Sequence, residues 1–345
     1  MTTREEVRPR RVGTVLIAWD LAPEYVEEIR RAFPDLRVVQ ETSPDGLLRI
    51  APDAEVLFAG DMPREVLRAA SHARWLHAAS AGVEDWFHPE LLEGDVVLTN
   101  SSGVHGSQIA EMILGMALCF ATGLHTLIAA QHAPDHGCRQ AAGGIDAEEA
   151  VRSIVQRRKF ELEGQTMGVI GLGAIGDATA RKAHGLGMRV LASRRHSADP
   201  PPYITQVLGP DRESLATLLR ESDHVALCLP LTPETDGLIG EAELRRMQQT
   251  AYIYNVGRGA SIDPHALERA LAEGWIAGAG LDVTVPDPPE HTSPLWDMPN
   301  VILSQHTSGS SPGNARRLTD LFLENLRRYR AGEPLLNQID KRLRY

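Results

Sequence analysis

Three short segments hold residue types that together suit hydride exchange at a 2-oxo acid. The first segment, Asn255-Val256-Gly257-Arg258-Gly259, places an arginine between two glycines. The second, residues 281–288, holds two aspartates, and the third, residues 304–309, holds His306. An arginine fork can bind the carboxylate, a histidine can protonate the carbonyl oxygen, and a nearby carboxylate keeps that histidine protonated. Each segment follows a predicted strand, where ligands of doubly wound sheets bind.

Taken one at a time, these residues have ordinary structural explanations. The chain has 13 histidines, and residue type alone does not favour His306 over His77, His105 or His265. A single aspartate after a strand is more often a helix cap than a catalytic group. The pattern therefore indicates a site only through the three segments together.

A second chemical signal lies upstream, in the run GVIGLGAIG at residues 168–176. Gly171, Gly173 and Gly176 form a G-x-G-x-x-G pattern between a predicted strand at 167–170 and a predicted helix at 177–184. In such a turn the first glycine allows the tight bend, the second admits a pyrophosphate, and the third packs helix against strand. The free N–H groups at the helix start attract the phosphates. With both flanking elements in place, the run predicts dinucleotide binding.

The choice between NAD and NADP is usually made about twenty residues further on, at the end of the second strand. Here that strand ends at Ser193-Arg194-Arg195, and no carboxylate follows before Asp199. Two guanidinium groups and a hydroxyl suit a 2′-phosphate. The alternative is a solvated basic loop. We predict NADP(H) as the preferred cofactor, with NAD(H) as the second choice.

The elements that must position these segments form two α/β series. Strands and helices alternate from residue 12 to about residue 105 and again from residue 166, a pattern typical of parallel sheets. A mostly apolar stretch at 107–130 predicts one long buried helix that connects the two series. The final amphipathic helix, predicted at 314–331, returns the chain to the first domain. Residues 131–160 are expected to form an insert of loop and short helix.

Composition and charge narrow the functional classes. The chain has 345 residues and a formal net charge of −11, which disfavours nucleic acid or an anionic membrane as a partner. Its three cysteines, Cys119, Cys138 and Cys228, form no close pair and predict neither a disulfide scaffold nor a metal site. The charged N-terminus lacks the apolar core of a signal peptide. A cytoplasmic enzyme that acts on a small molecule is the expectation.

The chain resembles the D-isomer-specific 2-hydroxyacid dehydrogenases, of the glyoxylate/hydroxypyruvate reductase type, over nearly its whole length. The matching segments follow the order of the family: ASAGVEDW (79–86), TNSSGVHGSQIAEMILGMAL (99–118), GVIGLGAIG (168–176), LPLTPET (229–235), NVGRG (255–259), GAGLDV (278–283), PLWDMPNVILSQHTSG (294–309) and LLNQID (335–340).

The resemblance implies two doubly wound domains, Rossmann-like and flavodoxin-like, with a cleft between them. The substrate-binding domain would comprise residues 1–105 plus 310–345. The NAD(P)-binding domain would comprise residues 106–309, with the insert near 131–160. The resemblance also implies a homodimer.

The resemblance further assigns roles to individual residues. Arg258, Asp287 and His306 would be catalytic. The substrate would be held by Ser80, Ala81, Gly82, Val83, Arg258 and His306. The cofactor would be bound by Val104, Gly171, Gly173, Ala174, Ile175, Ser193, Arg194, Arg195, Leu229, Pro230, Thr235, Val256, Asp282 and His306. No metal is expected.

Two departures from the family pattern stand next to the chemistry. The acid that pairs with the histidine is commonly a glutamate, whereas Asp287 occupies that position here, and Glu290 follows three residues later. The shorter aspartate is expected to weaken the pairing with His306. The residue before the histidine is commonly proline and is Gln305 here. The 131–160 stretch also looks longer than is usual, which bears on substrate identity.

The sequence thus predicts NADPH-dependent reduction of a small 2-oxo acid to a D-2-hydroxy acid. Glyoxylate or hydroxypyruvate would be the substrate class. One alternative is a formate- or phosphite-type dehydrogenase on the same fold. The other is a catalytically weak, nucleotide-sensing binding protein, which intact Arg258 and His306 disfavour.

Overall fold

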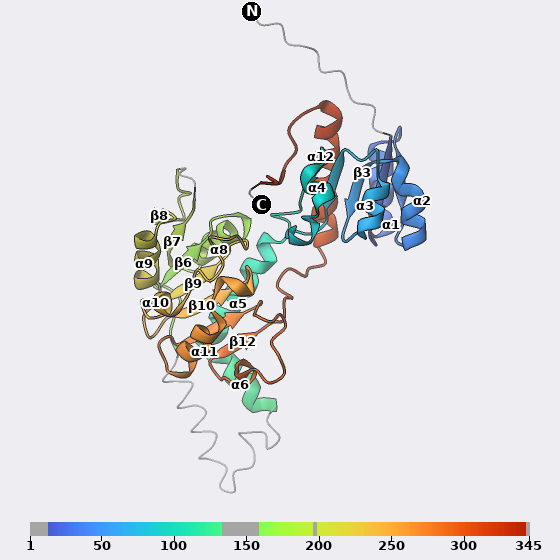
Figure 1. Ribbon diagram of the computed structural model, residues 1–345. Helices are drawn as coiled ribbons and strands as arrows, with labels where there is room; N and C mark the ends of the chain where they lie inside the picture. Colours follow the sequence, from blue (N-terminus) through green and yellow to red (C-terminus); the bar gives the residue numbers. More distant parts are fainter. Residues whose placement is uncertain (1–12, 133–158, 196–198, 343–345) are drawn as a thin grey trace, which may run out of the picture. The chain divides into compact units, whose positions relative to one another are not determined.

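The chain divides into two compact units in the computed structural model, which describes residues 13–132, 159–195 and 199–342 (Figure 1). Unit 1 comprises Met1–His105 and Ser311–Tyr345, and unit 2 comprises Gly106–Ser310. Most of the predicted insert, residues 133–158, lies outside the described residues. Each unit has its own sheet and its own core.

Unit 1 is built on a five-stranded parallel sheet with the order β2-β1-β3-β4-β5. Its strands are β1 (Thr14–Ala18), β2 (Arg37–Gln40), β3 (Ala54–Ala59), β4 (Trp75–Ala78) and β5 (Val97–Thr99). Nearly every residue of β1, β3 and β4 is buried, as expected for strands that are covered on both faces.

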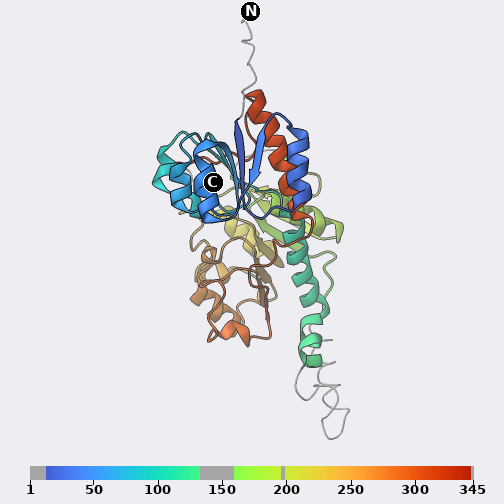
Figure 2. The same ribbon diagram turned by 90° about the vertical axis from the view of Figure 1, so that its right-hand side faces the viewer.

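Helices cover both faces of this sheet. One face packs against α2 (Pro44–Ile50), α3 (Arg64–Ala69) and α4 (Pro89–Glu93) through a core that includes Leu47, Val66 and Leu91. The other packs against α1 (Pro23–Ala32) and α12 (Asn314–Ala331), which lie side by side in Figure 2. The C-terminal helix α12 therefore completes the core of unit 1, as the sequence predicted.

Unit 2 is built on a seven-stranded parallel sheet with the order β12-β11-β10-β9-β6-β7-β8. Its strands are β6 (Thr166–Ile170), β7 (Arg189–Ser193), β8 (Gln206–Leu208), β9 (His224–Leu227), β10 (Tyr252–Asn255), β11 (Gly278–Leu281) and β12 (Val301–Leu303). Strand order reverses between β6 and β9, and in doubly wound sheets the ligand crevice lies at such a reversal.

Helices also cover both faces of the second sheet. On one face lie α5 (Gly106–Thr122) and α8 (Ala174–Gly185), and on the other α9 (Arg212–Glu221), α10 (Glu241–Leu244) and α11 (Pro264–Ala272). The predicted cap of α11 is confirmed, because Asp263 accepts a hydrogen bond from the Ala266 backbone N–H at 2.9 Å, with Pro264 at the first position. The predicted fold class, two parallel α/β sheets, is confirmed as well.

One predicted element is wrong in its form. The single long helix expected over 107–130 is two helices, α5 and α6 (Leu124–His132), because Gly123 adopts a left-handed backbone with φ 71°. The two axes bend by 73° at this break. Glycine takes such a conformation at little cost, and an apolar run by itself does not show the break.

Within the described residues, no single helix is long and apolar enough to cross a membrane. The segment Gly106–Thr122 with Leu124–Ala130 meets the length and composition test only as a bent pair.

Candidate active site

The glycine turn joins β6 to α8 at the point where the strand order reverses. Gly171 has φ 96°, and the Ser193 carbonyl accepts the backbone N–H groups of Gly171 and Leu172 at 3.1 Å. A Cβ on Gly176 would stand 2.1 Å from the Gly171 carbonyl oxygen. The first glycine thus makes the bend, and the third lets the helix approach the strand.

The start of α8 suits a phosphate. Gly173 is the N-cap and provides no side-chain cap, so the N–H groups that begin the helix at Ala174 and Ile175 are left for a ligand. A Cβ on Gly173 would meet nothing within 4 Å, which is the open space that a pyrophosphate needs. The turn therefore fits a dinucleotide.

The predicted 2′-phosphate residues stand at the end of β7. Ser193 is its last residue and is buried, and the backbone N–H of Arg194 donates to the Leu208 carbonyl at 3.2 Å. The pKa of Glu234 is lowered, first by a hydrogen bond from Thr232 and also by the charge of Arg195. The 193–195 segment and the LPLTPET segment are therefore neighbours.

The LPLTPET turn is held by its own threonines. Thr235 Oγ1 donates to the Pro230 carbonyl at 2.7 Å and accepts the Thr232 N–H at 2.8 Å. Leu229, which begins the turn, lies so close to Gly171 that a Cβ on the glycine would stand 2.6 Å from Leu229 Cδ2. The turn thus borders the glycine loop.

Arg258 follows β10 in a loop that Asn255 fixes. The buried Asn255 side chain accepts the Gly257 N–H at 3.1 Å and donates to the Arg258 carbonyl at 2.9 Å. The Arg258 guanidinium donates to the Gly257 carbonyl at 2.9 Å. Val256, in the same loop, is buried.

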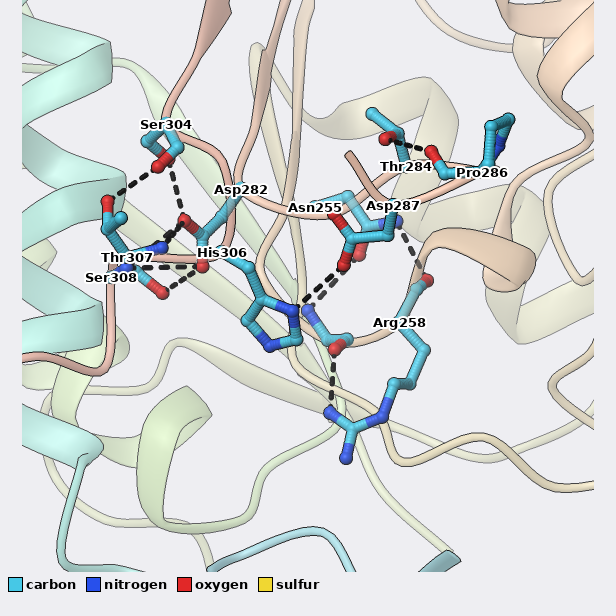
Figure 3. A network of polar contacts seen from close by, with 11 residues as sticks. Asn255, Arg258, Asp282, Thr284, Pro286, Asp287, Ser304, His306, Thr307 and Ser308 are labelled. Carbon is cyan, nitrogen blue, oxygen red and sulfur yellow. Dashed lines mark hydrogen bonds and ion pairs between the residues drawn. The ribbon is translucent and has the colours of Figure 1, made fainter. Parts of the chain in front are cut away.

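His306 pairs with Asp287 (Figure 3), since its Nδ1 lies 2.8 Å from the Asp287 carboxylate. The His306 side chain is 58% exposed, so the ring is open to a reactant. The shorter aspartate therefore lies within hydrogen-bond distance of the ring. Among the other candidates, His77 is fully buried and His265 is an exposed residue of α11.

The loop that carries His306 has an unusual backbone. Gln305 and His306 have φ values of 51° and 58°, a left-handed conformation that few non-glycine residues adopt. Proline, whose φ is fixed near about −65°, does not fit this conformation at position 305. The departure from the family pattern at Gln305 therefore agrees with the observed backbone.

The predicted substrate segment lies in unit 1, directly after β4. Ser80 Oγ donates to the Gly82 carbonyl at 2.6 Å, and Asn100 Nδ2 donates to the Ala81 carbonyl at 2.6 Å. Val83 is buried. Val104, predicted near the nicotinamide, is buried in unit 1 as well, and its carbonyl accepts a hydrogen bond from Arg317 at 2.7 Å.

Comparison with known proteins identifies the family. The family model for the D-isomer specific 2-hydroxyacid dehydrogenase NAD binding domain matches residues 125–308. A glyoxylate reductase from Korarchaeum cryptofilum is 32% identical over 288 residues, which cover 80% of this chain and 79% of that protein. The chain belongs to the D-isomer-specific 2-hydroxyacid dehydrogenase family. It is an NAD(P)-dependent oxidoreductase of 2-hydroxy acids.

Solved structures agree with the assignment. A D-isomer specific 2-hydroxyacid dehydrogenase from Xanthobacter autotrophicus, in complex with NADPH and MES, is 27% identical with a TM-score of 0.76 and covers 97% of this chain and 100% of its own. An NADPH-dependent glyoxylate/hydroxypyruvate reductase from Sinorhizobium meliloti, with NADP and sulfate, is 25% identical with a TM-score of 0.77 and covers 96% and 100%.

Sequence reasoning about this dehydrogenase missed the side chains that hold its loops. Asn255, Ser304 and Ser308 received no role, yet Asn255 fixes the Arg258 loop and both serines donate to Asp282. Their only signal in the sequence is that small polar residues stand at the ends of buried strands, next to the candidate catalytic residues.

Proposed function

We propose that this dehydrogenase reduces a small 2-oxo acid to a D-2-hydroxy acid with NADPH as the preferred cofactor. The observation that carries the proposal is the 2.8 Å pair of His306 and Asp287, which stands with Arg258 in the same unit as the glycine turn. The glyoxylate reductase names of the relatives support glyoxylate or hydroxypyruvate as the substrate class.

NADPH supplies the hydride when it is bound. Side chains of this protein bind and orient the substrate and provide the proton. The Arg258 fork binds the substrate carboxylate and orients the adjacent carbonyl. The protonated His306 ring donates its Nε2 proton to the carbonyl oxygen. Asp287, bonded to Nδ1, keeps the ring oriented.

Preference for NADPH rests on the end of β7. A carboxylate there would bind the ribose hydroxyls of NAD and repel a 2′-phosphate, whereas Ser193, Arg194 and Arg195 offer a hydroxyl and two cations. The neighbour from Sinorhizobium meliloti, described as NADPH-dependent, supports this choice.

The two units take different tasks in this proposal. Unit 2 binds the nucleotide through Gly171, Gly173, Ala174 and Ile175, and the segments after β9 and β10 border the nicotinamide. In unit 1, the backbone of residues 80–83 contributes to substrate carboxylate binding, as the family resemblance implies.

We also propose a homodimer. Four large apolar side chains, Leu118, Leu124, Leu127 and Ile128, are 39–46% exposed at the end of α5 and on α6. The last three follow the i, i+3, i+4 spacing of one helix face. Exposed apolar residues gathered on one face mark a protein contact, and a second copy of this chain is the partner that fits the family.

The test is NADPH oxidation at 340 nm with a panel that includes glyoxylate, hydroxypyruvate and bulkier 2-oxo acids, run beside NADH. We expect faster turnover with NADPH and its loss in Arg258→Ala and His306→Ala. Chiral chromatography of the product checks for the D-isomer.

Three results would contradict parts of the proposal. Turnover with NADH alone would refute the role given to Ser193–Arg195. Oxidation of formate or phosphite, without reduction of any 2-oxo acid, would favour that alternative chemistry. NADPH binding without turnover on any of these compounds would favour the nucleotide-sensing alternative.

A further inference from the structure

Asp282 is a buried carboxylate directly after β11. It is 2% exposed, and its backbone N–H donates to the Asn255 carbonyl at 3.0 Å, which ties it to the end of the neighbouring strand. Burying an ionised carboxylate is costly unless donors surround it. The donors of Asp282 therefore show what the residue holds.

Within the part of the chain that the structure describes, every hydrogen-bond donor to the Asp282 carboxylate belongs to residues 304–308 (Figure 3). Oδ1 accepts Ser304 Oγ at 2.7 Å, the Thr307 N–H at 2.9 Å and the Ser308 N–H at 3.1 Å. Oδ2 accepts the Ser308 hydroxyl. The Asp282 main-chain carbonyl accepts the His306 N–H at 2.6 Å.

These bonds enclose the two left-handed residues. Ser304 precedes the pair Gln305 and His306. Thr307 and Ser308 follow the pair, and the His306 backbone N–H is itself bonded to the Asp282 carbonyl. Left-handed backbone is unfavourable for residues with a Cβ, so this loop needs an external restraint. Asp282 supplies one on both sides of the strained pair.

We infer that Asp282 is a positioning residue, which holds the 304–308 loop so that the His306 ring meets Asp287. The inference rests on the proposed function for its kinetic consequence. It differs from the direct nicotinamide contact that family resemblance implies for this position, because both carboxylate oxygens are bonded to the loop.

The test compares Asp282→Asn with the wild type. Asparagine has the shape of the aspartate side chain but replaces one acceptor oxygen with an NH2 donor. The Ser308 hydroxyl and the N–H groups of the loop therefore lose one of their two acceptor atoms. Misplacement of a catalytic group by about 1 Å costs about 100-fold in rate, so we expect kcat to fall about 100-fold. If Asp282 acts through the loop and not through the nicotinamide, the KM for NADPH should stay within about twofold.

Two further variants make the result specific. Ser308→Ala removes a single donor and should lower kcat by about tenfold, in proportion to a partial loss of positioning. Asp223→Asn is the matched control. Asp223 directly precedes β9, at the N-terminal ends of the strands of the same sheet, and its Oδ2 accepts the Thr166 N–H at 2.9 Å, so kcat should not change.

A second readout needs no substrate. Hydrogen exchange of the Thr307 and Ser308 amides should be at least about tenfold faster in Asp282→Asn, with the rest of unit 2 unchanged. Unchanged exchange in that variant would overturn the inference, and so would a rise in the KM for NADPH at constant kcat. If the wild type reduced no 2-oxo acid, the proposed function would fail while the exchange result still decided the role of Asp282.

Discussion

At the scale of single residues, the pair of Asp287 and His306 shows how position compensates for length. An aspartate side chain is one methylene shorter than glutamate, yet the carboxylate lies 2.8 Å from the ring. Since both side chains are partly exposed, such a pair adds little to folding stability. Its value is therefore chemical, in the orientation of the ring.

Replacing Asp287 with asparagine should impair reduction. Without the carboxylate the His306 ring loses the charged acceptor that holds its Nδ1, so kcat should fall by about tenfold or more. Steady-state rates of Asp287→Asn and wild type check this expectation. Glu290→Gln is the control, because Glu290 lies three residues away; an equal loss in that variant would speak against a specific pair.

At the scale of elements, the contact between β6 and α8 depends on the absence of a side chain. A Cβ at Gly176 would stand 2.1 Å from the Gly171 carbonyl oxygen and 3.0 Å from Val169 Cγ1. Backbone on one side and a buried strand residue on the other leave little room to adjust. The helix would have to move away from the strand, and the turn would move with it.

Gly176→Ala should therefore destabilise unit 2 by about 1–3 kcal/mol, the usual cost of overpacking, and weaken NADPH binding. Gly185→Ala, on the last residue of the same helix, is the matched control because a Cβ there meets nothing within 4 Å. That change should be neutral or stabilising by up to about 1 kcal/mol. Urea unfolding and NADPH titration measure both effects, and similar losses in the two variants would refute the packing argument.

The elements also show which parts of the fold could be predicted from the sequence. The other strands of both sheets, the glycine turn and the Asp263 cap follow from local patterns, and each was found near its predicted place. The short strand β8, Gln206–Leu208, was missed because one exposed and two partly buried residues at a sheet edge give no clear pattern. The bonds between Asp282 and residues 304–308 join two segments that only the folded sheet brings together, so spacing did not reveal them.

At the scale of the whole molecule, each unit buries one neutral histidine among its described residues. In unit 1, His77 lies between Thr99 Oγ1 at 2.7 Å and Ser101 Oγ at 3.3 Å. In unit 2, His224 lies between Tyr254 Oη at 2.9 Å and Gln165 Oε1 at 2.7 Å. Burial lowers the pKa of His77 to about 3 and the pKa of His224 to about 4.

Acid should therefore destabilise both units. The unfolded histidines bind protons below about pH 6.5 and the folded ones do not, so stability is full above that pH and is lost as the pH falls toward the folded values. At pH 5 each histidine should cost about 2 kcal/mol. Urea unfolding at pH 7.5 and pH 5 of wild type and His77→Gln checks this: the variant should be less stable at pH 7.5 but lose less on acidification.

The exposed apolar face of α5 and α6 gives a prediction about assembly. A charge in a dimer interface is costly to bury, so Leu127→Asp combined with Ile128→Asp should yield a monomer in light scattering. Leu48→Asp is the control, because Leu48 is an equally exposed leucine on α2, at 38%. A dimer that survives the double change would place the interface elsewhere, and a monomeric wild type would exclude it.

The left-handed pair at Gln305 and His306 has a consequence for heat inactivation. Each such residue costs about 1–2 kcal/mol, so release of the loop from Asp282 recovers part of the free energy that opening requires. Local opening of this kind needs less free energy than unfolding of a parallel sheet that is covered on both faces. On heating, reductase activity should disappear several degrees before the circular dichroism of the helices changes, and it should return on cooling if the sheets have stayed intact.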